Sequence, residues 1–231
     1  MNLSNEQFDV SREFFNDGAT GEPIQDYTHR VEVGGPIGKF FVWKSVGVNE
    51  DGLWLIENRE GEVIPITDAV PEDRQFYGNG IPKHIIGFNN SFTYKRFDLE
   101  VNMRGAFGHD ILNFQRMFYE NPKNIAYNML NTAYDPVYGQ RLNSDLAYVS
   151  HYIESGDYLK LDNVTFGYSF PGRGIMKNAR VYASGLNLFV LTKYQGIDPE
   201  GVSILGFAPG NDQRDKYPTT RTFTLGLNIS F

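Results

Sequence analysis

Hydrophobic and polar residues alternate without a break along the last stretch of the chain, TFTLGLNISF, which ends at Phe231. A period of two residues is typical of a β-strand whose two faces meet different surroundings. The apolar positions are Phe223, Leu225, Leu227, Ile229 and Phe231, and the polar or small positions are Thr222, Thr224, Gly226, Asn228 and Ser230. We therefore expect a strand with one apolar face that runs to the final residue.

The same alternation occurs in three other segments. HIIGFNNSFTY (84–94) and FDLEVNMRGAF (97–107) are separated only by Lys95 and Arg96, which predicts two strands joined by a tight hairpin turn. YLKLDNVTFGYSF (158–170) repeats the pattern. Weaker patterns predict further strands at Asn2–Phe15, Arg30–Val46 and Ala179–Thr192. Together with the terminal segment, the pattern predicts about seven strands.

The connections between these strands alternate between short and long. In chain order they are Asn16–His29, Gly47–Lys83, Lys95–Arg96, His109–Gly156, Pro171–Asn178 and Lys193–Pro218. Loops longer than about 15 residues are uncommon in compact soluble domains. An outer-membrane β-barrel has short turns at one rim and long extracellular loops at the other. On the alternation alone, a soluble β-sandwich with a dry core is the alternative.

A free-standing sheet of this kind cannot span a membrane. In hydrocarbon every backbone N–H and C=O has to be paired, and an open sheet leaves two unpaired edges. Single-chain bacterial barrels have an even number of strands, from about eight upwards. The pattern therefore predicts an all-β protein in which residues 1–231 form the carboxyl-terminal portion of a large antiparallel transmembrane β-barrel.

Composition narrows the classes of function. No run of about 18 apolar residues occurs, so no transmembrane helix is predicted. The formal net charge is −7, and no basic cluster is longer than the pair Lys95–Arg96, which argues against nucleic-acid binding. The chain contains no cysteine, so disulfides and thiolate chemistry are excluded. Its amino end lacks the basic and apolar regions of a secretory signal.

Five sequence blocks in a fixed order carry a family resemblance. They are GEPIQDYTHRVEVGGPIGKFFVWKSVG, GNGIPKHIIGFNNSFTYKRFDLEVNMRGAFGHDILNFQRM, YIESGDYLKLDNVTFGYSFPG, ARVYASGLNLFVLTKYQGIDPE and YPTTRTFTLGLNISF. From about Thr20 to Phe231 they resemble the end of SusC/RagA-type TonB-linked outer-membrane transporters. The resemblance implies a barrel of about 22 strands, with the signal peptide, TonB box, plug domain and earlier strands upstream of residue 1.

The resemblance also implies a function and a location. It points to import of oligosaccharides, with peptides as the nearest competitor, across the outer membrane of a Gram-negative, Bacteroidota-like bacterium. The implied partners are a SusD-like surface lipoprotein, outer-membrane lipid, and TonB–ExbB–ExbD acting through the upstream part. No cofactor is expected. Two alternatives are a siderophore or vitamin receptor of the same barrel type and a soluble β-rich ligand-binding protein.

In that family, a terminal strand that ends in Phe resembles the signal read by the barrel assembly machinery. The resemblance therefore gives the terminal apolar positions Phe223, Leu225, Leu227, Ile229 and Phe231 an expected role in membrane insertion. The competing interpretation of Phe231 is an ordinary apolar strand end.

Aromatic residues at the ends of a long connection are candidate ligand contacts. Trp43 and Trp54 lie near the start of Gly47–Lys83, and Phe76 and Tyr77 lie near its end. Packing of the loop, or anchoring at the membrane interface, is the competing interpretation. Helix-like apolar spacing at 111–118 and 125–130 predicts small helical pieces inside the longest connection.

Polar residues along the second hairpin strand, Asp98, Glu100, Asn102 and Arg104, share a face and are expected to line the barrel lumen. Two carboxylates on one face could serve acid–base catalysis, but a salt-bridged polar wall explains them as well. The sequence has no HExxH, GxSxG, P-loop or GxGxxG motif. We therefore expect no enzyme activity and no catalytic or metal site. Residues 49–52 form only a fragment of a calcium loop, and an Asx turn is the preferred interpretation.

Overall fold

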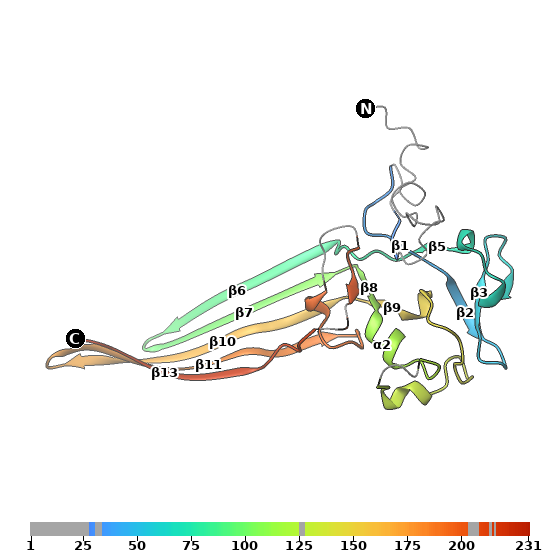
Figure 1. Cartoon of the computed structure of the whole chain (residues 1–231). Coiled ribbons are helices and arrows are strands. Elements are labelled where there is room, and N and C mark those ends of the chain that lie inside the picture. The colour runs from blue at the N-terminus through green and yellow to red at the C-terminus, as the bar shows by residue number, and fades with distance from the viewer. Residues whose placement is uncertain (1–27, 31–33, 125–127, 203–207, 213, 215) are drawn as a thin grey trace, which may run out of the picture. The chain divides into compact units, whose positions relative to one another are not determined.

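The computed structural model describes residues 28–30, 34–124, 128–202, 208–212, 214 and 216–231. These residues form two compact units (Figure 1). The strand unit comprises Lys83–Gly108, Asp157–Lys193 and Tyr217–Phe231. The loop unit comprises the described residues of Met1–Pro82, His109–Gly156 and Tyr194–Lys216. The predicted strand Asn2–Phe15 lies outside the described residues.

The strand unit is one antiparallel sheet of five long strands (Figure 1). They are β6 (His84–Tyr94), β7 (Phe97–Phe107), β10 (Tyr158–Arg173), β11 (Met176–Thr192) and β13 (Thr222–Ser230). Their spatial order, β6-β7-β10-β11-β13, is also their order along the chain. The sheet is therefore an up-and-down meander, which is the topology of a barrel wall.

Tight turns and long connections alternate between these strands, which confirms the predicted alternation for the last four connections. Lys95 and Arg96 alone join β6 to β7, and Gly174 and Ile175 alone join β10 to β11. Gly174 has a φ of +65°, a left-handed conformation that glycine adopts without steric cost. The second turn is shorter than predicted because β10 and β11 stay paired up to Arg173 and Met176. The connections from β7 to β10 and from β11 to β13 are the long ones.

Cross-strand register places the apolar positions of all five strands on one face. One row across the sheet, from β6 to β13, consists of Phe92, Leu99, Phe166, Ala183 and Leu225. The adjacent row, one residue along each strand and therefore on the opposite face, consists of Ser91, Glu100, Thr165, Ser184 and Thr224. Each strand thus has an apolar and a polar face, and the pairing places the apolar faces of all five strands on the same side of the sheet.

A β-bulge in β10 keeps the two faces consistent. Leu161 pairs with Met103 and Asn163 pairs with the next residue of β7, Asn102, so Asp162 is an extra residue. One extra residue reverses the side to which the following side chains point. Leu161 and Val164 consequently lie on the same apolar face, although they are three positions apart.

The loop unit is built from three small sheets and short helical turns. The strands are β1 (Phe40–Val42) with β5 (Gln75–Tyr77), then β2 (Lys44–Val48), β3 (Trp54–Glu57) and β4 (Val63–Pro65), then β12 (Asn211–Asp212), β8 (Asp110–Asn113) and β9 (Ile153–Ser155). The helix α2 spans Phe114–Tyr119, and 3-10 turns occupy Ile66–Asp68, Pro71–Asp73, Asn131–Tyr134, Ser150–Tyr152 and Pro199–Gly201. No helix among the described residues is long and apolar enough to cross a membrane.

A hydrophobic core holds the loop unit together. Phe40, Trp54 and Ile56 pack in one cluster with Leu112 and Met117, and each of the five side chains is at most 2% exposed. These residues come from two long connections, 28–82 and 109–156, that are separated in sequence by the hairpin of β6 and β7. Burial of side chains of this size stabilises a fold by about 1.5–3 kcal/mol each. The long connections therefore pack as a folded body rather than as independent loops.

One predicted strand of the sheet is corrected by this core. Strand β1 falls within the predicted strand Arg30–Val46 and β2 overlaps its end, but neither joins the five-stranded sheet. All three residues of β1 are buried, so this stretch has no exposed face and belongs to an ordinary protein interior. The sheet therefore has five of the seven expected strands in the described part of the chain: Arg30–Val46 does not join it, and Asn2–Phe15 is not tested.

The predicted helical pieces are also shorter than expected. Residues 110–113 form β8, and α2 begins at Phe114 because the side chain of Asn113 accepts a hydrogen bond from the backbone N–H of Arg116, at 3.1 Å. In the second predicted piece, residues 125–127 lie outside the described residues, and 128–130 are not helical.

We expect the chain expressed alone to aggregate in detergent-free buffer. Within the described sheet, β6 and β13 each lack a strand partner along one edge, and such edges pair with other chains. Sedimentation and size-exclusion chromatography, with and without detergent, measure this directly. A soluble monomer that melts cooperatively without detergent would contradict the membrane-sheet interpretation.

Candidate functional site

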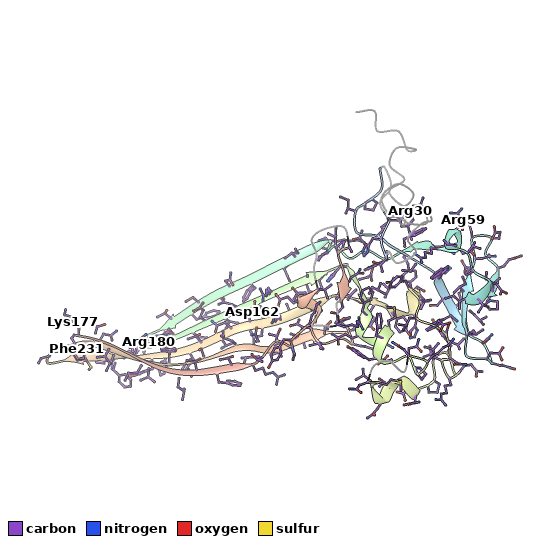
Figure 2. The ribbon with its side chains drawn as sticks, in the orientation of Figure 1. Arg30, Arg59, Asp162, Lys177, Arg180 and Phe231 are labelled. Atoms are coloured by element: carbon purple, nitrogen blue, oxygen red, sulfur yellow. The ribbon has the colours of Figure 1, made fainter. Side chains whose placement is uncertain are left out.

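The apolar face of the strand unit is a candidate functional surface. Phe88 is 51% exposed, Phe92 55% and Leu225 85%, in a sheet where the apolar rows continue from β6 to β13. Soluble monomers rarely expose contiguous apolar surface on this scale. Figure 2 shows side chains projecting along the whole length of the sheet. This face has the character of a surface that is solvated by lipid.

The polar face opposite carries charges that are already paired. Arg104 Nε lies 3.0 Å from Asp162 Oδ2, and Asn102 donates to Glu100 Oε1 at 3.0 Å. Asp98 receives both its hydrogen bonds from Arg180, with Nε donating to Oδ1 at 3.0 Å. Asp98, Glu100, Asn102 and Arg104 therefore share one face, as the alternation predicts. Asp98 and Arg104 form ion pairs, and Glu100 is hydrogen-bonded to the neutral amide of Asn102.

The carboxylates of this wall do not converge on a common point. Asp98 is bound by Arg180 from β11, whereas Glu100 accepts from Asn102 within β7. Within the described ranges, no three His, Asp or Glu side chains gather into a group that could hold a metal ion. The geometry thus offers neither a shared cleft for acid–base chemistry nor a ligand cage in this part of the chain.

The terminal strand β13 presents its predicted apolar residues outward. Phe223, Leu225, Leu227 and Ile229 are 45–85% exposed, and Phe231, which directly follows the strand, is 73% exposed. Among the described strands, β13 pairs only with β11, so its other edge is open. An open edge and an exposed aromatic end are both accessible to a partner strand or to assembly factors. The expected role of these five residues in insertion stays a prediction.

Of the four candidate aromatic contacts, Trp54 is buried. Its side chain is 1% exposed, and its ring centroid lies 5.2 Å from that of His151 and 5.8 Å from that of Tyr152. Trp54 therefore fills the core of the loop unit, as the packing interpretation proposed, and offers no ring face to a ligand.

Trp43 and Phe76 are partly buried, and each has a cation over its ring. The guanidinium of Arg74 lies 4.2 Å from the ring centroid of Trp43, and Lys39 Nζ lies 5.0 Å from that of Phe76. Both arrangements are cation–π contacts. Tyr77, at 42% exposure, is the most accessible of the four candidates.

A polar pocket of about 350 Å³ opens in the loop unit. It is lined by Glu50, Asp51, Pro122, Lys123, Gln140, Arg141, Leu142 and Asn143. One wall is the turn between β2 and β3, where Asn49 Oδ1 accepts from the backbone N–H of Leu53 at 2.8 Å. This contact spans four residues, whereas an Asx turn spans two. The turn is instead closed by a backbone hydrogen bond from Gly52 N–H to the Asn49 carbonyl at 2.9 Å, with Gly52 in the left-handed region at a φ of +83°. The pocket is within the size range of small-molecule sites, and its amides and charges suit a hydrophilic ligand.

An ion-pair cluster that sequence reasoning missed fastens α2 to β9. Arg116 reaches Glu120 and Glu154, each at 2.7 Å, and all three side chains are largely buried. The i,i+4 spacing of Arg116 and Glu120 is visible in the sequence. The contact to Glu154 is not visible, because it requires the long connection to fold back on itself.

Two histidines of the loop unit are held in the neutral form by burial. Loss of hydration lowers the pKa of His29 and of His151 to about 4. His29 Nε2 donates to the carbonyl of Pro209 at 2.8 Å, and the Thr28 hydroxyl lies 2.9 Å from its Nδ1. This histidine therefore links two stretches of the loop unit that are far apart in sequence.

Comparisons with known proteins place the chain within one receptor class. No protein-family profile matches it. Over 95% of its length it is 30% identical to TonB-dependent receptor P3 of Formosa agariphila, and over 87% it is 28% identical to TonB-dependent receptor SusC of Bacteroides thetaiotaomicron. The alignments cover 24% and 20% of those receptors, so the chain spans a fifth to a quarter of the length of these curated relatives.

Solved structures show the same fold. The RagAB peptide importer in the open-open state matches 89% of this chain and 24% of that chain, with a TM-score of 0.70 and 20% identity. In the closed-closed state the TM-score is 0.64 over 85% of this chain, with 21% identity. At this level of identity the likeness concerns the fold.

Lowering the pH should loosen the loop unit. Because the folded pKa of His29 and His151 is about 4, below the ordinary histidine value of about 6.5, the unfolded chain binds protons between these two pH values that the folded chain does not. The free energy of unfolding should therefore fall as the pH drops from 6.5 towards 4, by up to about 1.4 kcal/mol per pH unit for each histidine. Below pH 4 it should level off.

Hydrogen exchange of the loop unit at pH 7, 5.5 and 4, in the complete receptor, measures this loss. His151→Gln should flatten the pH dependence. His84→Gln, at an exposed position in β6, is the matched control and should leave the dependence unchanged. If stability depended equally on pH in the unsubstituted receptor and in both variants, the role of buried His151 in the pH dependence would be contradicted.

Proposed function

Because the chain belongs to the SusC/RagA-type TonB-dependent receptors of the bacterial outer membrane, we propose that it is a carboxyl-terminal portion of such a receptor and supplies barrel wall and extracellular loops to a nutrient importer. The observation that carries the proposal is the apolar face that continues across five antiparallel strands, with a polar face behind it. In this assignment Asp98, Glu100, Asn102 and Arg104 line the lumen, and the loop unit folds on the extracellular side.

The proposed cargo is an oligosaccharide. The pocket in the loop unit combines carboxylates, amides and a guanidinium, which are groups that hydrogen-bond to hydroxyls. Peptides are the second candidate, because the matching solved structures are of the RagAB peptide importer. The relatives are receptors and importers by name, and the proposal includes no enzymatic step.

The proposed partners follow from the same relationship. A SusD-like surface lipoprotein would cover the extracellular side and help to capture the cargo. TonB, with ExbB and ExbD, would act on the upstream part of the receptor and not on these residues. Phe231 and the apolar positions of β13 would serve barrel insertion.

Deleting the gene from its source bacterium tests the cargo. We expect slower growth on oligosaccharide mixtures as the only carbon source, with growth on free monosaccharides and on peptides unchanged. Restoring the complete gene should restore growth. A defect confined to peptides would select the second candidate, and no defect on either cargo would contradict import of both.

Substituting neighbouring residues of β10 tests which face meets lipid. Phe166 lies on the apolar face and Thr165 on the polar face, in adjacent rows of the sheet. Phe166→Arg should destabilise the folded receptor by about 2–4 kcal/mol, because a charge would enter hydrocarbon. Thr165→Arg adds the same charge on the polar face and should have little effect.

The measurement is the folded fraction of each receptor in outer-membrane preparations during urea unfolding. Equal destabilisation by the two substitutions would argue against lipid on the apolar face. The reverse order, with Thr165→Arg the more damaging, would mean that the two faces are assigned the wrong way round.

A further inference from the structure

Large and small side chains alternate along one row of the polar face. The row consists of Asp98 in β7, Gly167 in β10, Tyr182 in β11 and Gly226 in β13, each paired with the next. Each glycine thus lies between or beside larger neighbours. The row connects four of the five strands, including the terminal one.

Gly167 provides the space for an ion pair between strands that are not adjacent. Strands β7 and β11 both pair with β10, and the guanidinium of Arg180 in β11 crosses β10 to reach the Asp98 carboxylate, with an Nε–Oδ1 distance of 3.0 Å. A Cβ at Gly167 would lie 2.5 Å from both carboxylate oxygens, so a larger residue would displace the pair. Gly167 is buried beneath this pair, although the sheet is only one layer thick there.

Gly226 provides the space for the ring of Tyr182. A Cβ at Gly226 would overlap the Cζ and Cε1 atoms of that ring. Along β13 the burial pattern is exposed at every residue except Gly226, which the ring partly covers. The Arg180 guanidinium lies 5.0 Å from the centroid of the same ring. The ion pair and the ring-on-glycine contact therefore form one connected cluster.

The terminal strand needs such a contact because its alternation does not define its register. A slip by two residues keeps every side chain of β13 on its own face. Phe223, Leu225, Leu227 and Ile229 would then replace one another against lipid at little cost. The same slip would place Thr224 or Asn228 opposite Tyr182, since β13 contains a single glycine.

We propose that Tyr182 and Gly226 set the register of the terminal strand, and that the Asp98–Arg180 pair above Gly167 holds the Tyr182 ring in position (Figure 2 labels Arg180). The ring fits only where glycine lies opposite, so pairing at any other even offset is penalised by overlap. These are positioning residues for assembly of the sheet. The proposal rests on the proposed role of β13 in a barrel wall and does not depend on the identity of the cargo.

Introduced cysteine pairs report the register in the complete receptor. The chain contains no cysteine of its own. Ser184 and Thr224 are direct partners on the polar face, so Ser184→Cys with Thr224→Cys should cross-link on oxidation when the register is as described. Ser184→Cys with Thr222→Cys reports a slip by two residues. Cross-linking is measured in outer-membrane preparations without cargo, so its outcome is independent of import.

Three further changes, each combined with these pairs, form the test. Gly226→Tyr places a second ring against Tyr182. Gly226→Tyr with Tyr182→Gly exchanges the ring and the glycine between the two strands. Gly87→Tyr is the matched control, because it adds the same side chain on the same face of β6, where nothing lies within 4 Å of a Cβ.

We expect Gly226→Tyr to lower the in-register cross-link about tenfold relative to Gly87→Tyr, because two rings cannot share the site. The exchange should restore the yield to within about twofold, since one ring again faces one glycine. The proposal is overturned if Gly226→Tyr cross-links as well as Gly87→Tyr. It is equally overturned if the exchange yields no more in-register product than Gly226→Tyr alone.

Discussion

Backbone pairing between consecutive strands is the constraint on which the rest of the structure depends. Once β6 is hydrogen-bonded to β7, and β7 to β10, the side of the sheet on which each side chain lies is fixed. The bulge at Asp162 shows how strict this constraint is, since one extra residue is needed to keep Leu161 and Val164 on the same face. In hydrocarbon the constraint is stronger still, because no water can replace a missing strand partner.

The sequence predicts the long strands well because the two faces of each strand have different surroundings, so apolar and polar residues alternate. The segments at 84–94, 97–107, 158–170 and 222–230 show alternation, and the structure confirms all of them. Arg30–Val46 was wrong as a strand of this sheet because Phe40–Val42 is buried on every side. In a short apolar run, burial in a folded loop and exposure to lipid favour the same residues, so pattern alone cannot distinguish them.

For individual side chains, the sequence predicts the face of a strand but not the contact partner. The shared face of Asp98, Glu100, Asn102 and Arg104 could be predicted from spacing alone, but the partner of Asp98 could not. Arg180 lies in a strand whose faces are ambiguous in sequence, because Ala183, Ser184 and Gly185 are all small. The burial of Trp54 depends on His151 and Tyr152, which only the folded loop unit brings near it. Contacts between distant segments leave no local pattern.

The two faces of the sheet therefore determine different features of strand pairing: which side of a strand points outward, and in which register it pairs. A lipid-facing surface discriminates weakly among Phe, Leu and Ile, because hydrocarbon solvates each of them without specific contacts. Such a face fixes which side of a strand points outward but leaves shifts by two residues nearly equal in free energy. The polar face has directional partners and defined volumes, such as the Asp98 carboxylate and the space above Gly226. In a sheet of this kind, alternation selects the face, and complementary side-chain size on the side away from lipid selects the register.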